Sequence, residues 1–158
     1  MSIESFALWL SETPLSMALT DSEWAFPALE SLHVIALALV VGSIGVVDLR
    51  LLGVASKQRD PAHLIRAILP LTWVAFAAAL ATGLLLFSAN PISYASNFYF
   101  LAKLGLLGVA GINMVLFHAF AHRHLATPGA LAPRVSGGVS LALWVTIVTC
   151  GRWIGFTL

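Results

Sequence analysis

The sequence predicts an all-α integral membrane protein, a bundle of four transmembrane helices. Of its 158 residues, 59% are hydrophobic and only 9% are charged, and the mean hydropathy is +0.95. A soluble domain of this size does not need so much apolar surface for its core, so most of it must face lipid. Four apolar stretches are also long enough to cross a hydrocarbon core, which takes about 20 helical residues.

The four stretches are separated by short linkers that contain proline, asparagine or glycine, so consecutive helices are expected to pack antiparallel. The second stretch carries a ridge of small residues, Ala75, Ala79 and Gly83, which lets a neighbouring helix approach closely. The whole chain, 1–158, is expected to form a single membrane domain. The predicted spans are 25–49, 65–88, 97–120 and 137–157.

Residues 1–22 precede the first span and have a pattern of their own. Ile3, Phe6 and Leu10 recur at helical spacing, and Pro14 stands at the first turn of a second helical stretch. We expect this segment to be an amphipathic helix along the membrane interface. It has no lysine or arginine, so it lacks the basic region of a cleavable signal peptide, and we expect it to be retained.

The distribution of basic residues predicts the orientation. Cytoplasmic loops are enriched in lysine and arginine, which the second loop and the N-terminal segment lack. Both termini are therefore expected outside, on the periplasmic side of a bacterial inner membrane. Asp48 and Arg50, at the inner end of the first span, are expected to be local partners. The basic residues in or beside the first and third loops are Arg50, Lys57, Arg59, Arg66, Arg123 and Arg134.

Charge and cysteine content argue against two classes of function. The net charge is only +1, and no face gathers basic residues between aromatic ones, so a nucleic-acid partner is not expected. The single cysteine, Cys150, can form no disulfide within the chain and belongs to no CxxC motif. The expected partner is the lipid bilayer, and a homo-oligomer or a larger membrane complex is the expected kind of assembly.

Four ionisable residues fall at one level of the outer half of the membrane. At the usual helical rise, His33 lies about 12 Å from the start of its predicted helix, and Lys103 about 9 Å from the outer end of its own. Arg152 reaches a similar level, and Glu30 lies one turn outside His33. An ionisable side chain at this depth is costly unless it is paired or faces a cavity, so these residues form the candidate site.

Several interpretations of this layer compete. In one, Glu30 pairs with a cation and His33 completes a network that only fixes the helix packing. In another, the layer binds haem b, with His33 on the iron and Lys103 and Arg152 on the propionates. Ions, protons or another ligand are further alternatives. The aromatic residues available as walls of a haem slot are Trp144, Trp153, Phe98 and Phe100.

The remaining histidines lie near the cytoplasmic side. His118 is about 22 Å further inward than Lys103, so it cannot be the second axial ligand of the same haem. His118 and His122 are one helical turn apart, and with His63 they could bind a metal ion or a second haem. The alternative is that 122–124, a His-Arg-His run, anchors the helix end among lipid head groups.

Two stretches resemble the membrane protoporphyrinogen IX oxidase family, HemJ. The first is Leu-His-Val-Ile-Ala at 32–36, which leads through Gly42 to Arg-Leu-Leu at 50–52. The second is Ala-Lys-Leu at 102–104, followed by an apolar run and His118. Similar histidine-led first helices occur in the copper-resistance CopD proteins and in uncharacterised four-helix bacterial membrane families. We expect the chain to belong to one of these uncharacterised families.

The resemblance to HemJ implies that His33 ligates haem iron and that Lys103 stands near the haem as ligand, propionate partner or proton donor. The chain also departs from that family. The tryptophan typical of its first helix is missing from 38–41, and Arg152 has no counterpart there. The resemblance therefore implies haem binding more than porphyrinogen oxidation.

The function expected from these observations is that of a haem-b-binding electron-transfer protein or membrane oxidoreductase. Its electron donor would be lipid-soluble or on the outer side, for example a quinone or a porphyrin-like substrate. The chemistry would belong to the haem, while Glu30 would orient His33 or relay a proton. The alternatives are a haem-free small transporter or ion-binding protein, and a structural or assembly subunit. Copper transfer is disfavoured because the three methionines are not paired at ligand spacing.

Overall fold

The computed structural model describes residues 3–55, 60–125, 127 and 130–157, apart from the side chains of Ile3, Glu4 and His122. Lys57 and Arg59 lie outside the described residues. All regular elements of the described part are helices, and four are long and apolar enough to cross a membrane, which confirms the predicted all-α multi-pass class. The spans are α3 (Ala25–Leu51), α4 (Pro61–Ala89), α6 (Phe98–Leu116), continued by the π-helical turn η1 (Phe117–Ala121), and α7 (Leu131–Thr157).

Two spans begin earlier than predicted, because prolines taken as loop punctuation belong to first helical turns. α4 begins at Pro61 and not at 65, after Asp60, whose carboxylate accepts a 2.9 Å hydrogen bond from the His63 backbone N–H. α7 begins at Leu131 and not at 137, with Pro133 in its first turn. Proline is tolerated there because its missing N–H would have no helical partner.

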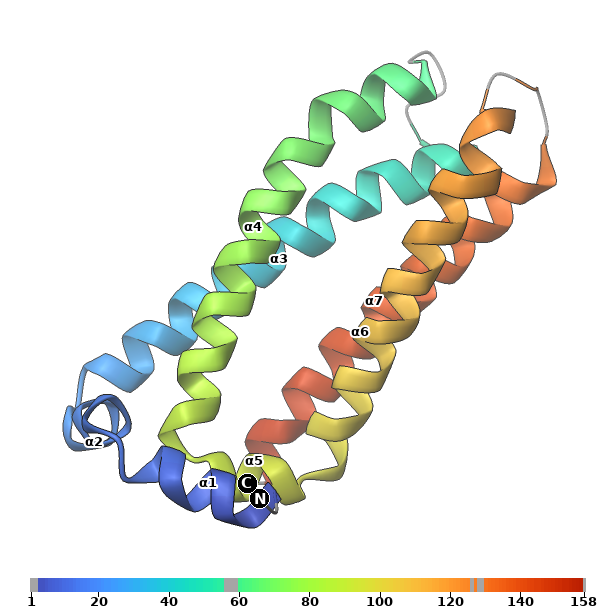
Figure 1. Ribbon diagram of the computed structural model, residues 1–158. Coiled ribbons are helices and arrows are strands. Elements are labelled where there is room, and N and C mark those ends of the chain that lie inside the picture. The colour runs from blue at the N-terminus through green and yellow to red at the C-terminus, as the bar shows by residue number, and fades with distance from the viewer. Residues whose placement is uncertain (1–2, 56–59, 126, 128–129, 158) are drawn as a thin grey trace.

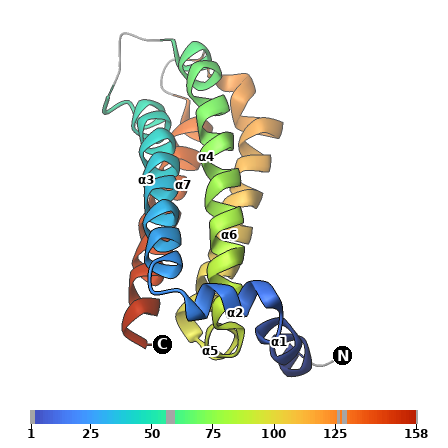
Figure 2. The same ribbon diagram turned by 90° about the vertical axis from the view of Figure 1, so that its left-hand side faces the viewer.

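Three short helices cover the end of the bundle at which α3 begins. α1 (Ile3–Ser11) and α2 (Pro14–Asp21) lie across this end, beside α5 (Pro91–Ser96), which connects α4 to α6 (Figures 1 and 2). The C-terminal end of α7 lies at the same end (Figure 1). At the opposite end, η1 continues into the 3₁₀ turn η2 (His122–His124).

The N-terminal segment is fixed to the bundle by hydrogen bonds from α2. Thr13 caps this helix by accepting a 3.3 Å hydrogen bond from the Ser16 backbone N–H. The buried Ser16 hydroxyl in turn donates to the Ser88 carbonyl at 2.7 Å. That carbonyl lies in the last turn of α4, where it has no partner in its own helix. The bond therefore ties the N-terminal segment to the end of the second span.

The four spans form two antiparallel hairpins, α3 with α4 and α6 with α7, and the hairpins approach each other through α3 and α7 (Figure 1). In the first hairpin the Thr72 hydroxyl donates to Ser43 Oγ at 2.8 Å. In the second the Asn113 side-chain amide donates to the Ser136 carbonyl at 3.2 Å. Among the described residues, α4 and α6 make no close backbone contact.

The core lies where the two hairpins meet. Val40 and Ile147 are 0% and 1% exposed, and they pack with Ala75 and Trp144. Ala75 and Ala79, two members of the small-residue ridge, are both buried, as close packing of α4 requires. Many large apolar side chains on the outside of the spans remain exposed, which fits helices that face lipid.

Candidate functional site

His33 lies on the face of α3 that packs against α4. Its Nδ1 is 2.9 Å from the Thr82 hydroxyl oxygen. The same hydroxyl also lies 2.7 Å from the Ala78 carbonyl, to which it can donate. In the tautomer that carries its proton on Nδ1, Thr82 accepts a hydrogen bond from this N–H, and the lone pair of the ring is on Nε2. Nε2 of that tautomer is an acceptor or a metal ligand.

Gly83 explains how the imidazole comes so close to α4. A Cβ atom at this position would lie 3.1 Å from His33 Cε1, which is tighter than ordinary van der Waals contact. The third member of the small-residue ridge therefore receives the histidine ring.

Lys103 lies on the other hairpin, where its side chain runs across Gly151 of α7. A Cβ atom on Gly151 would be 3.5 Å from Lys103 Nζ. The positive charge of Lys103 is close enough to act on His33. No carboxylate pairs with Lys103 in the part of the chain that the structure describes. The structure thus places two of the four predicted site residues near each other, from opposite hairpins.

Glu30 and Arg152 take other positions. Glu30 is exposed on α3, and its charge acts on the Tyr94 phenol of α5. Burial raises the pKa of Tyr94, and the negative charge of Glu30 raises it further. The Arg152 guanidinium is also exposed and stands over the Phe156 ring of its own helix, 4.6 Å from the centroid. No described contact joins Arg152 to His33 or Lys103.

The predicted aromatic walls are only partly near this pair. Phe100 stacks on Phe87 of α4, with centroids 5.4 Å apart and planes 8° apart. Phe87 lies one helical turn from Gly83, and Phe100 lies one turn from Lys103, so the stack closes the His33–Lys103 region at the end that carries α5. Phe98 and Trp153 are exposed, and Trp144 belongs to the core.

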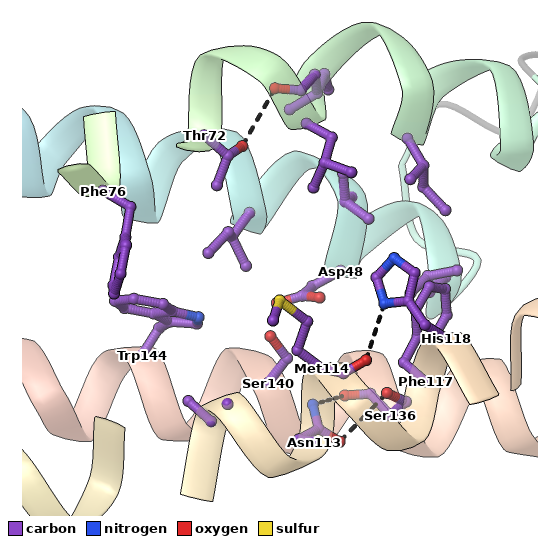
Figure 3. Close-up of a pocket in the computed structure, with 18 of the residues that line it drawn as sticks. Asp48, Thr72, Phe76, Asn113, Met114, Phe117, His118, Ser136, Ser140 and Trp144 are labelled. Atoms are coloured by element: carbon purple, nitrogen blue, oxygen red, sulfur yellow. Dashed lines mark hydrogen bonds between the residues drawn. The ribbon is translucent and has the colours of Figure 1, made fainter. Parts of the chain in front are cut away.

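A partly open cavity of about 360 Å³ lies between the hairpins, closer to the end that carries η1. Its walls are mainly apolar, and Trp144 and Phe76 stand at one end of it (Figure 3). Asp48 lines the cavity with only 4% of its surface exposed, and the Ser140 hydroxyl faces it from α7. Asp48 Oδ2 has no hydrogen-bond partner among the described residues.

Sequence reasoning missed this cavity and assigned Asp48 to the interface as a partner of Arg50. The described contact of Asp48 is with Ser140 instead. Residues two apart on a helix point to nearly opposite sides, so Asp48 reaches the cavity from a different face of α3 than the face that carries Arg50. The sequence signal that could have revealed the cavity was Asp48 itself, a carboxylate inside a helix of high mean hydropathy.

The histidines at the η1 end of the bundle do not gather into a metal site within the described structure. No group of three histidine, cysteine, aspartate or glutamate residues there could hold a metal ion. His118 lines the cavity, and its Nδ1 is 2.9 Å from the Met114 carbonyl. His63 is exposed at the start of α4, and the side chain of His122 lies outside the described part.

The fold and the site define a multi-pass helical membrane protein with a histidine–lysine pair in one half and a mainly apolar cavity in the other. The chain belongs to DUF6644, a family of unknown function, whose model matches residues 24–157. The matched range contains all four spans and leaves out α1 and α2. No curated protein and no solved structure matches the chain. The likeness to HemJ and CopD therefore stays a resemblance of short motifs.

Proposed function

We propose that this protein binds haem b and transfers electrons within the membrane, with His33 as an axial ligand of the iron. The observation that carries the proposal is the contact between His33 Nδ1 and Thr82. Haem iron takes a neutral imidazole, and a hydrogen bond at the other ring nitrogen fixes both the tautomer and the orientation of such a ligand.

Lys103 supports the same proposal. Its ammonium is partly buried in a spanning segment, without a carboxylate partner among the described residues. An ammonium in this position favours an anion, and a haem propionate is an anion that would lie beside the iron ligand. Glu30 would relay protons or orient His33 from one turn away, and Arg152 would meet a second anionic group at the outer surface.

The His33 imidazole and the Lys103 ammonium fit haem chemically. The porphyrin ring, however, needs space that the described side chains fill. The cavity lies in the other half of the bundle, and the Phe87–Phe100 stack closes the His33–Lys103 region at the end that carries α5. Haem binding would therefore open this stack, with the two rings becoming flat walls of the slot. A second protein ligand to the iron would come from His33 of a second copy, or from Lys103 in place of its contact with a propionate.

The proposed setting is the inner membrane of a bacterium, with the termini and the His33 level outside. The absence of basic residues from the second loop and the N-terminal segment supports this orientation. Phe6, Leu8 and Trp9 of α1 are exposed at the same end of the bundle, which supports an interfacial position of this helix. The electron donor would be lipid-soluble or on the outer side, such as a quinone or a porphyrin-like substrate.

The test is the absorption spectrum of detergent-purified protein, oxidised and dithionite-reduced, after expression with added haem. We expect a Soret band with reduced α and β bands, lost in His33→Ala and kept in the matched control His124→Ala, which removes an exposed histidine. The ratio of haem to chain then identifies the source of the second ligand. One haem per chain indicates Lys103, and one haem per two chains indicates His33 of a second copy. A colourless wild-type protein at full haem supply would overturn the proposal in favour of an ion-binding or structural role.

A further inference from the structure

The cavity between the hairpins has the size and lining of a small-molecule site. Its volume of about 360 Å³ lies within the usual range for such sites, roughly 300–1,000 Å³. All four spans contribute side chains to it, with flat aromatic surfaces from Trp144 and Phe76. None of the residues of the proposed haem site lines it. It must therefore be explained separately.

Asp48 gives this cavity a carboxyl group that the protein satisfies only in part, through the Ser140 hydroxyl. The side chain is 4% exposed, and Oδ2 lacks a hydrogen-bond partner in the described structure. Burial of a polar atom without a partner is unfavourable, so natural proteins rarely keep one without a role. A bound molecule that hydrogen-bonds to Oδ2 would remove this cost.

A seam between α4 and α6 adjoins the cavity. Side chains of both helices line the cavity, although these helices make no close backbone contact among the described residues. The seam ends at the Phe87–Phe100 stack on one side and at the core cluster that contains Ile65 and Phe117 on the other. The part between these contacts adjoins the cavity. A ligand that dissolves in the bilayer could therefore enter sideways.

We propose that the cavity binds the ring of a lipid-soluble quinone or quinol, with one ring oxygen hydrogen-bonded to Asp48. The aromatic pair Trp144 and Phe76 offers flat surfaces for such a ring (Figure 3). A carboxyl group and the His118 imidazole line the same cavity, so it contains groups suited to both a carbonyl and a hydroxyl oxygen. An apolar tail would leave through the α4–α6 seam.

Two glycines of α6 provide a matched pair of variants. Gly111 lines the cavity, whereas Gly108 is exposed and does not line it. A Cβ atom added at either position meets nothing within 4 Å. Gly111→Leu therefore fills the cavity, while Gly108→Leu adds the same side chain one turn away on the outside.

The experiment is calorimetric titration of the purified protein with decylubiquinone. We expect saturable binding that is lost in Gly111→Leu and unchanged in Gly108→Leu. Asp48→Leu, which removes the carboxyl group that hydrogen-bonds to the ring oxygen, should weaken binding about tenfold, as loss of one hydrogen bond predicts. The proposal would be overturned if the wild type does not bind, or if Gly111→Leu and Asp48→Leu both bind as tightly as the wild type.

Tetraphenylphosphonium serves as the competing probe. If it binds in the cavity and the quinone does not, the site belongs to lipophilic cations and the quinone proposal is wrong. These titrations are made on protein purified without added haem. Failure of the haem spectrum and failure of quinone binding are therefore separate results.

Discussion

His33 and Thr82 join the first two spans through a contact of 2.9 Å between Nδ1 and the hydroxyl oxygen. The contact links residues 49 positions apart in the sequence. The neutral Thr82 hydroxyl is the hydrogen-bond partner of one ring nitrogen, so the histidine needs no carboxylate to hold its orientation.

Thr82→Val should weaken haem binding by about 10- to 100-fold, because it removes the acceptor for Nδ1–H while keeping the shape of the side chain. Thr82→Ser should restore most of the affinity. Haem titration into the haem-free protein measures both. Thr149→Val is the control, since the Thr149 hydroxyl is exposed and donates only within its own helix, to the Val145 carbonyl. Equal affinity of Thr82→Val and wild type would remove Thr82 from the site.

Gly83→Ala should destabilise the protein by about 1–3 kcal/mol, because the added methyl group meets His33 Cε1 at 3.1 Å. The ring cannot move away freely while Thr82 holds Nδ1. Thermal unfolding in detergent measures the effect. Gly108→Ala meets nothing within 4 Å and should leave stability unchanged or slightly increased. A melting temperature for Gly83→Ala at or above that of Gly108→Ala would contradict the packing described here.

Asp48→Leu should stabilise the protein by about 1–3 kcal/mol, since it replaces a buried, incompletely satisfied carboxyl group by an apolar side chain beside a cavity. A purely structural Asp48 would give the opposite sign. Asp60→Ala is the comparison, because it removes the N-cap of α4 and should cost about 1 kcal/mol. Chemical denaturation measures the change in the free energy of unfolding for both variants, which should be positive for Asp48→Leu and negative for Asp60→Ala.

Tyr94 should ionise at a higher pH than a free tyrosine, whose pKa is 10.0, because burial and the Glu30 charge both disfavour the phenolate. The folded state holds this proton more tightly than the unfolded state. Its contribution to stability is therefore complete below pH 10 and decreases as the pH rises through the folded pKa. Tyrosinate absorbance, with Tyr94→Phe as the baseline, measures the titration, and Glu30→Gln should shift it to lower pH. An unchanged curve in Glu30→Gln would show that burial alone causes the shift.

Hydropathy predicted the four spans because the requirement for apolar residues at membrane depth acts on every turn of each helix. It could not locate the starts of α4 and α7, because Pro61 and Pro133 can terminate a loop or begin a helix. Helical rise placed His33 and Lys103 at one level, and the structure puts them near each other. The same calculation placed Arg152 at that level but could not show that its guanidinium turns toward Phe156.

The cavity was missed for a different reason. Residues that line an internal space, such as Ile44 and Leu107, are as apolar as residues that face lipid. Only the spatial arrangement of all four helices separates the two environments. Asp48 was visible in the sequence, but its position three residues before the end of α3 made an interfacial role the simpler interpretation.

The hydrogen bonds inside each hairpin have a consequence for biogenesis. Each hairpin can satisfy these polar groups from its own two helices, as soon as both have left the insertion machinery. Asp48 is different, because the Ser140 hydroxyl that faces it belongs to the last span to be synthesised. A nascent chain that ends after α4 would therefore hold one exposed carboxyl group in the bilayer until α7 arrives. The bonds that join the helices of each hairpin are His33 with Thr82, Thr72 with Ser43, Asn113 with Ser136, and Asn97 with Thr157.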